Sequence, residues 1–119
     1  MSRVRKFHET LALYHKHGWR LARVLMTAEA LGELRGASET AEARFEGVEP
    51  QESAVDAMWF TRAAQGGREA WELRQVGEPY ALFEMFEQDE EEEDREDVRR
   101  EMEARLGERL TPRAEGDGA

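Results

Sequence analysis

The residues best suited to bind a metal or move a proton are three histidines near the N-terminus: His8, His15 and His17. Zinc sites on helices use ligands three or four residues apart and add a further ligand from elsewhere in the chain. His8 and His15 are seven residues apart, and the segment "HETLALYHKH" contains no HExxH motif. We therefore expect ordinary helix-surface histidines and assign no metal ligands.

Nucleophilic catalysis would need a serine or threonine, because the chain has no cysteine. No serine stands in a G-x-S-x-G elbow, and the glycine pair in "AAQGGREA" lacks the lysine and the helix of a phosphate loop. Carboxylates are so numerous that no pair stands out as an acid–base couple. The sequence thus identifies no catalytic or cofactor-binding residue, although an enzyme stays an open alternative.

The strongest local feature is a run of six consecutive acids: Asp89, Glu90, Glu91, Glu92, Glu93 and Asp94. Acids at the start of a helix complement the positive end of its dipole, so the run has a structural explanation. Six like charges exceed what a first turn needs, which leaves open docking onto a basic partner or onto the chain's own basic N-terminus. A calcium loop requires spaced ligands and a turn glycine, and the run has neither.

Positive charge is concentrated at the N-terminus, where residues 1–23 hold six Arg or Lys and one acid. Two helices joined at Gly18 would superficially resemble a helix-turn-helix, which makes nucleic-acid binding a third hypothesis. The net charge of the whole chain is -10, however, and an acidic body repels phosphates at long range.

The length of 119 residues fits one domain. The chain has no apolar run near the ~20 residues of a membrane span, and its N-terminus does not resemble a signal peptide. We therefore expect a cytoplasmic protein without a membrane partner. The absence of Ile and Asn, and the use of Arg over Lys, suggest a bacterial gene with G+C-rich codons.

Apolar spacing predicts an amphipathic helix over residues 3–17, with its apolar face formed by Val4, Phe7, Leu11 and Tyr14. Residues 19–26 fit either a strand or a helix, and we favour a strand. A short helix over 28–34 and a long loop over 36–53 follow.

Three apolar runs between residues 55 and 87 predict an antiparallel meander. A two-residue turn at Gly66 and Gly67 would place Phe60 opposite Leu73. Trp59 would then lie on the more polar face. The other face would gather Met58, Phe60, Trp71 and Leu73.

The third run of the meander, "YALFEMF", is apolar on both faces, so it should be covered on both, by helices or by another chain. Tyr80, Leu82 and Phe86 would point one way. A long C-terminal helix should begin near Asp89. Its apolar stripe would comprise Val98, Met102, Leu106 and Leu110.

The sequence therefore predicts a single α+β domain over residues 1–110, with a disordered tail over 111–119. An N-terminal and a long C-terminal helix should cover one face of an antiparallel sheet made of the meander and a fourth strand. The favoured function is a non-catalytic interaction module, adaptor or chaperone-like, that binds another protein or a second copy of itself. The alternative is a small-molecule-binding domain or enzyme with a pocket between sheet and helices. The expected interaction surface comprises Trp59, Tyr80, Leu82, Phe86 and the six acids Asp89, Glu90, Glu91, Glu92, Glu93 and Asp94.

Overall fold

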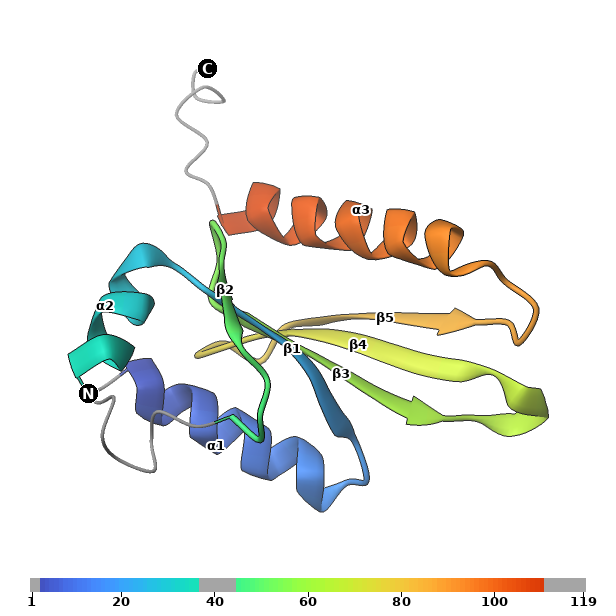
Figure 1. Ribbon diagram of the computed structural model, residues 1–119, viewed down its shortest axis with the longest axis horizontal. Coiled ribbons are helices and arrows are strands. Elements are labelled where there is room, and N and C mark those ends of the chain that lie inside the picture. The colour runs from blue at the N-terminus through green and yellow to red at the C-terminus, as the bar shows by residue number, and fades with distance from the viewer. Residues whose placement is uncertain (1–2, 37–44, 111–119) are drawn as a thin grey trace.

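The computed structural model describes residues 3–36 and 45–110 and has the α+β architecture that the sequence predicts (Figure 1). The elements in chain order are α1 (Arg3–Lys16), β1 (Arg20–Met26), α2 (Ala28–Gly36), β2 (Pro50–Glu52), β3 (Ala57–Ala63), the 3-10 turn η2 (Gln65–Gly67), β4 (Glu69–Gln75), β5 (Ala81–Phe86) and α3 (Glu92–Leu110). The ambiguous segment after α1 is a strand, as favoured. The expected loop over 36–53 contains the short strand β2, and the tail expected to be disordered lies outside the described residues.

The described strands form one mixed sheet in the order β2-β1-β3-β4-β5. Strands β3, β4 and β5 are the predicted meander, and β1 adds to it antiparallel to β3. Only the pairing of β1 with β2 is parallel. The two border strands of the sheet are therefore β2, three residues long, and β5, six residues long.

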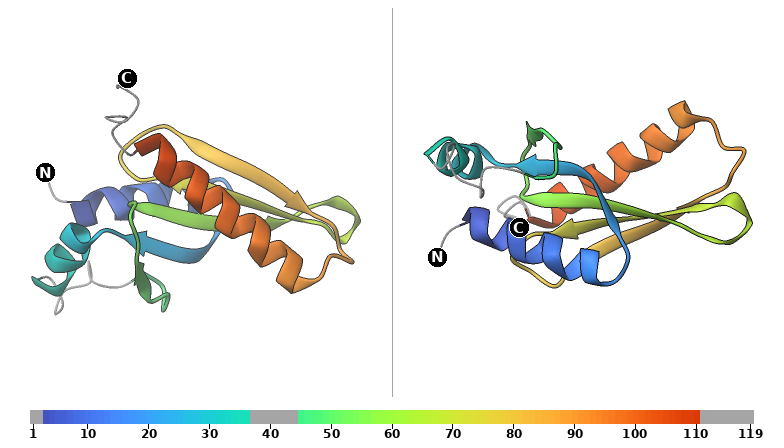
Figure 2. Two further views of the ribbon diagram at one scale, coloured as in Figure 1. Left: turned by 90° about the horizontal axis from the view of Figure 1, so that it is seen from above. Right: turned by 60° about the horizontal axis from the view of Figure 1, so that its bottom comes forward.

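Helices cover both faces of this sheet, so the expectation that they cover only one is wrong. Figure 1 shows α1 and α3 on opposite sides of the strands, and Figure 2 shows α3 crossing the sheet diagonally. The reason lies in β3, where five consecutive residues from Ala57 to Thr61 are buried. A strand that is buried on both faces needs a cover on each side.

The predicted pairing of β3 with β4 is also wrong, by one residue, because Phe60 lies opposite Glu72 and Trp59 lies opposite Leu73. The connection is longer than two residues: Ala64 N–H donates to Arg68 O at 2.9 Å around the turn η2. Gly67 has φ of 76°, and a Cβ there would lie 2.5 Å from Gln88 Oε1. A shift of one residue moves a strand's side chains to the opposite face relative to its neighbour.

The core on the α1 side contains the predicted stripe of Val4, Phe7, Leu11 and Tyr14, all of which are buried. The Tyr14 ring stacks on Phe60 of β3, with ring centroids 4.1 Å apart and planes 9° apart. The first turn of α1 is capped from α2, since the Glu33 carboxylate accepts hydrogen bonds from Arg3 N–H and Val4 N–H, each at 3.1 Å. This contact fixes α2 against the start of α1.

The core on the α3 side differs from the predicted helix stripe at both ends. The helix begins at Glu92 instead of Asp89, and Leu110 is 39% exposed. Met102 and Leu106 are buried as expected, and Val98 packs against them. The third buried residue of the helix is Arg99, which the apolar pattern could not include.

Leu106 tests whether α3 is part of the folded unit, because its side chain is fully buried against the sheet. We expect Leu106→Ala to lower the free energy of unfolding by roughly 2–4 kcal/mol, through lost burial and the cavity left behind. Urea denaturation followed by circular dichroism measures this. An unchanged midpoint would mean that the helix does not contribute to the stability of the domain.

Candidate functional site

Arg99 of α3 is the most unusual side chain in the structure, because it is charged and only 2% exposed. Its guanidinium lies 4.0 Å from the centre of the Trp71 ring, a cation–π contact with β4. Arg99 Nη1 donates to Glu92 Oε2 at 2.8 Å and to Glu96 Oε1 at 2.9 Å. The buried charge is therefore balanced by two carboxylates of its own helix, as a desolvated cation requires.

Two further polar contacts bind α3 to strands β1 and β3. Arg23 of β1 forms a two-pronged pair with Glu96, at 2.6 and 3.1 Å. Trp59 of β3 donates its indole N–H to Glu103 Oε2 at 2.7 Å. The hydrogen bond from Arg23 lowers the pKa of Glu96 below its usual 4.5. We call Arg23, Glu96, Arg99 and Trp71 the α3 clamp.

The acidic run divides between structural and exposed side chains. Glu92 lies in the first turn of α3 and pairs with Arg99, and Glu90 accepts a hydrogen bond from Glu87 N–H at 2.6 Å. These contacts support the interpretation of the run as a helix start. Glu92 is exposed despite this pair, and so are the four remaining acids, Asp89, Glu91, Glu93 and Asp94.

The expected apolar surface faces α3 and is largely covered by it. Trp59 is fully buried there instead of lying on a polar face, because of the shifted register, and Phe86 is 1% exposed. Tyr80 and Leu82 are partly buried against the same cluster, and Arg109 stacks 3.8 Å from the Tyr80 ring centre. In the isolated chain, the four aromatic and aliphatic residues of the expected surface thus pack beneath a helix.

The opposite face of β5 is the one that lies open. Phe83 is 54% exposed, the highest value among the large apolar side chains in the described part of the chain. It lies opposite Glu72 of β4, and its neighbours on the same face are Ala81 and Met85, both partly buried. Sequence reasoning identified β5 as apolar on both faces but selected the wrong face as the free one.

A shallow groove separates this open face from α1. One depression of about 330 Å³ and another of about 250 Å³ share Leu13 of α1 and Arg74 of β4 in their linings, so they lie next to each other. Glu72, the neighbour of Phe83, lines the second and accepts a hydrogen bond from Tyr14 O–H at 2.5 Å. The uncovered half of the α1-side face is therefore polar along the groove and apolar along β5.

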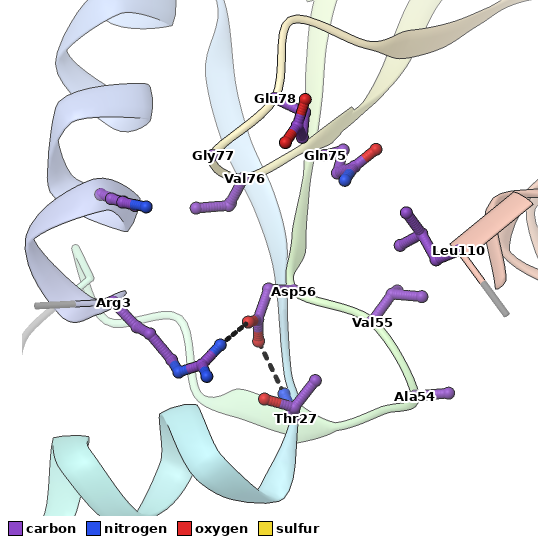
Figure 3. A pocket seen from close by; sticks show the side chains of 11 residues that line it. Arg3, Thr27, Ala54, Val55, Asp56, Gln75, Val76, Gly77, Glu78 and Leu110 are labelled. Carbon is purple, nitrogen blue, oxygen red and sulfur yellow. Dashed lines mark hydrogen bonds and ion pairs between the residues drawn. The ribbon is translucent and has the colours of Figure 1, made fainter. Parts of the chain in front are cut away.

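A third depression, of about 280 Å³, lies between the first turn of α1 and the residues around Asp56 (Figure 3). Asp56 Oδ1 accepts a hydrogen bond from Thr27 N–H at 2.8 Å, and Oδ2 lies 3.5 Å from Arg3 Nη1. Gln75 Oε1 in its wall is buried without a hydrogen-bond partner among the described residues. Asp56 and Arg3 already connect α1 with the ends of β1 and β3. We therefore interpret the polar groups of this depression as structural contacts and do not assign a binding site to it.

His17 lines the second depression of the groove, whereas His8 and His15 have other contacts. His8 stacks on Phe45 with ring centroids 4.5 Å apart, and His15 Nε2 lies 3.0 Å from Glu46 Oε2. Within residues 3–36 and 45–110, no three His, Cys, Asp or Glu side chains are grouped as a metal ion would require. No helix in the same ranges is long and apolar enough to cross a membrane.

The chain was compared with protein-family models, with curated proteins and with solved structures, and no match was found in any of the three. Function must therefore be argued from the geometry of the chain itself.

The α3 clamp makes stability depend on pH. Because the folded-state pKa of Glu96 is lowered, its contribution is present above pH 4.5 and is lost as pH falls through the folded pKa. We expect Glu96→Gln to cost roughly 1.5–3 kcal/mol at neutral pH, the range for hydrogen bonds to charged groups, and to flatten the acid limb of the stability curve. Urea denaturation from neutral to acid pH measures both effects.

The control for this variant is Glu101→Gln, which removes an exposed pair with Arg105 at 3.8 Å on the same helix. Exposed pairs contribute little, so its curve should follow that of the unmodified protein. Equal losses in the two variants would contradict a special role for Glu96.

Tyr14, which lines the groove, should lose its proton only at a pH well above that of an ordinary tyrosine. Burial first, and then the hydrogen bond to Glu72, raise the pKa of Tyr14 to about 12. Its contribution to stability is therefore complete below pH 10 and is lost as pH rises through 12. Ultraviolet titration of the Tyr80→Phe variant isolates Tyr14, and adding Glu72→Gln should lower its pKa. Ionisation near pH 10 in the folded protein would contradict this environment.

Proposed function

We propose that this protein is a non-catalytic interaction module that binds its partner by adding a strand to β5. The observation that carries the proposal is that β5 is a six-residue border strand with the 54% exposed Phe83 beside its open edge. An added strand would gain main-chain hydrogen bonds along the edge and apolar contact with Phe83 and Met85.

The two borders of the sheet differ in a way that supports this proposal. Proteins guard exposed strand edges by making them short or by placing proline, lysine, a bulge or an inward charge on them. Strand β2 is three residues long and begins with Pro50. Strand β5 is twice as long and has no proline, lysine or register shift, and the one guarding charge that it carries is Glu84, on the side that α3 covers. A long and weakly guarded apolar edge invites aggregation unless a partner pairs with it.

The backbone direction along β5 also suits strand addition. Gln75 N–H donates to Tyr80 O at 2.9 Å, which places Tyr80 in a hydrogen-bonded pair with β4. Hydrogen bonding alternates along antiparallel pairs, so the backbone groups of Ala81, Phe83 and Met85 are directed away from β4. The residues with free backbone groups are thus the same ones whose side chains lie on the open face.

Affinity capture tests the proposal. The tagged chain is used to retain partners from a lysate of the cells that naturally produce it, and the retained proteins are identified by mass spectrometry. We expect a stoichiometric partner, either another protein or untagged copies of this chain. Phe83→Lys and Met85→Pro should each abolish its retention. Proline at 85 removes an N–H that points outward, so it should block the edge while sparing the bonds to β4.

Leu110→Lys is the matched control, because Leu110 is another exposed apolar residue, at 39%, and lies outside β5. It should retain the partner as well as the unmodified chain does. Circular dichroism and thermal unfolding of each variant check that the domain remains folded. Retention that is equal in all folded variants, or absent throughout, would overturn the proposal. Retention lost only when Asp89, Glu91, Glu93 and Asp94 are neutralised would instead favour the acidic run.

A further inference from the structure

We infer that the strand added to β5 is β5 of a second copy of this chain, paired antiparallel about a two-fold axis at Phe83. This inference rests on the proposed function and names its partner. The two sheets would then join into one continuous sheet, with Phe83 of each copy beside that of the other.

The register follows from which residues can pair. Two antiparallel strands exchange hydrogen bonds only where both residues direct their backbone groups into the gap. On β5 those residues are Ala81, Phe83 and Met85. An axis at Phe83 aligns all of them, since Ala81 of each copy lies opposite Met85 of the other, and Phe83 lies opposite Phe83.

Charge disfavours one of the two neighbouring registers. An axis at Glu84 would place the two Glu84 carboxylates directly opposite each other, an unfavourable pairing of like charges. The axis at Phe83 places Glu84 opposite the apolar side chain of Leu82 instead. Strand β5 has no other charged residue, so the register centred on Phe83 has no like charges in opposed positions.

The surroundings of β5 leave room for a second strand. Helix α3 covers the other face of the sheet and packs on Leu82, Phe86 and Tyr80. The left view of Figure 2 shows β5 along the border of the molecule, with α3 crossing inward from it. No described strand other than β4 pairs with β5.

Net charge gives the association a characteristic salt dependence. Each chain carries a net charge of -10, so two copies repel each other at low ionic strength. Raising the salt concentration from about 0.05 to 0.3 M should therefore tighten the dimer. Docking of the acidic run onto a basic partner would weaken over the same range.

Cysteine cross-linking tests the register, and the chain is well suited to it because it has no cysteine of its own. Hydrogen-bonded antiparallel pairs have Cα atoms about 5.5 Å apart, within the range that a disulfide spans. Phe83→Cys should therefore form a covalent dimer under mild oxidation. Met85→Cys alone should not, because its two copies would lie about 13 Å apart along the strands. Mixing the Ala81→Cys and Met85→Cys variants should restore cross-linking.

Leu13→Cys, at a 42% exposed position on α1, controls for random collision. Sedimentation equilibrium of the cysteine-free chain supplies an independent measurement. It should show a monomer–dimer equilibrium whose dissociation constant rises about tenfold or more in Phe83→Lys, since interface aromatics often dominate binding.

Two results would overturn the inference. One is a purified chain that stays monomeric at every concentration; the other is cross-linking of Met85→Cys or Leu13→Cys as fast as Phe83→Cys. A monomer that nevertheless captures a different protein through β5 would remove the second copy as partner and leave the proposed function standing. Loss of all β5-dependent capture would remove both.

Discussion

The rest of the structure depends on how α3 closes one face of the sheet, where a buried cation lies beside the apolar contacts of Met102 and Leu106. Arg99 fills a position that an aliphatic residue would ordinarily occupy, and it stacks on Trp71 while Glu92 and Glu96 balance its charge. Replacing a buried ionic cluster with apolar residues is often neutral or stabilising. The benefit of Arg99 is therefore better sought in specificity. If the helix were shifted by one turn, the Arg99 guanidinium would lose its contact with the Trp71 ring, and Glu96 would be separated from Arg23.

The closure also determines which surface is left for a partner. Once α3 covers Leu82, Phe86 and Trp59, the only side of β5 that remains open is the one bearing Phe83. Helix α1 lies over β1 and β3 and leaves a groove where another helix could have lain. The interaction surface that we propose is thus the part of the sheet that neither long helix reaches.

The fold class was predictable from the sequence because it depends on local patterns. The stripe of α1 and the three runs of the meander each have their own periodicity and turn signals, and the structure confirms them. The register was not predictable. Gly67 is part of the turn and also leaves room for the side chain of Gln88, which is distant in sequence. The sequence alone does not show that this glycine pair belongs to a connection longer than two residues. The error in register put Trp59 on the wrong face. Phe83 was missed because the helices were expected to cover only one face of the sheet. Arg99 was missed for a related reason. A charged residue is buried only where the tertiary structure supplies partners for it, and the apolar pattern of a helix does not show those partners.

The order of the strands has a consequence for how the chain is made. The two faces of the sheet are completed at different stages of synthesis. Helix α1 is made first and β1 soon afterwards, but β1 lies between β2 and β3 and gains neighbours only when those later strands have emerged. The apolar face with Trp59, Trp71 and Phe86 is covered later still, because the helix that packs on it, α3, is the last one to be synthesised. When β5 has left the ribosome, all strands of the sheet are therefore present but one of its faces is still uncovered. Folding can be completed only after the segment of α3 that contains Leu106 has left the ribosome as well.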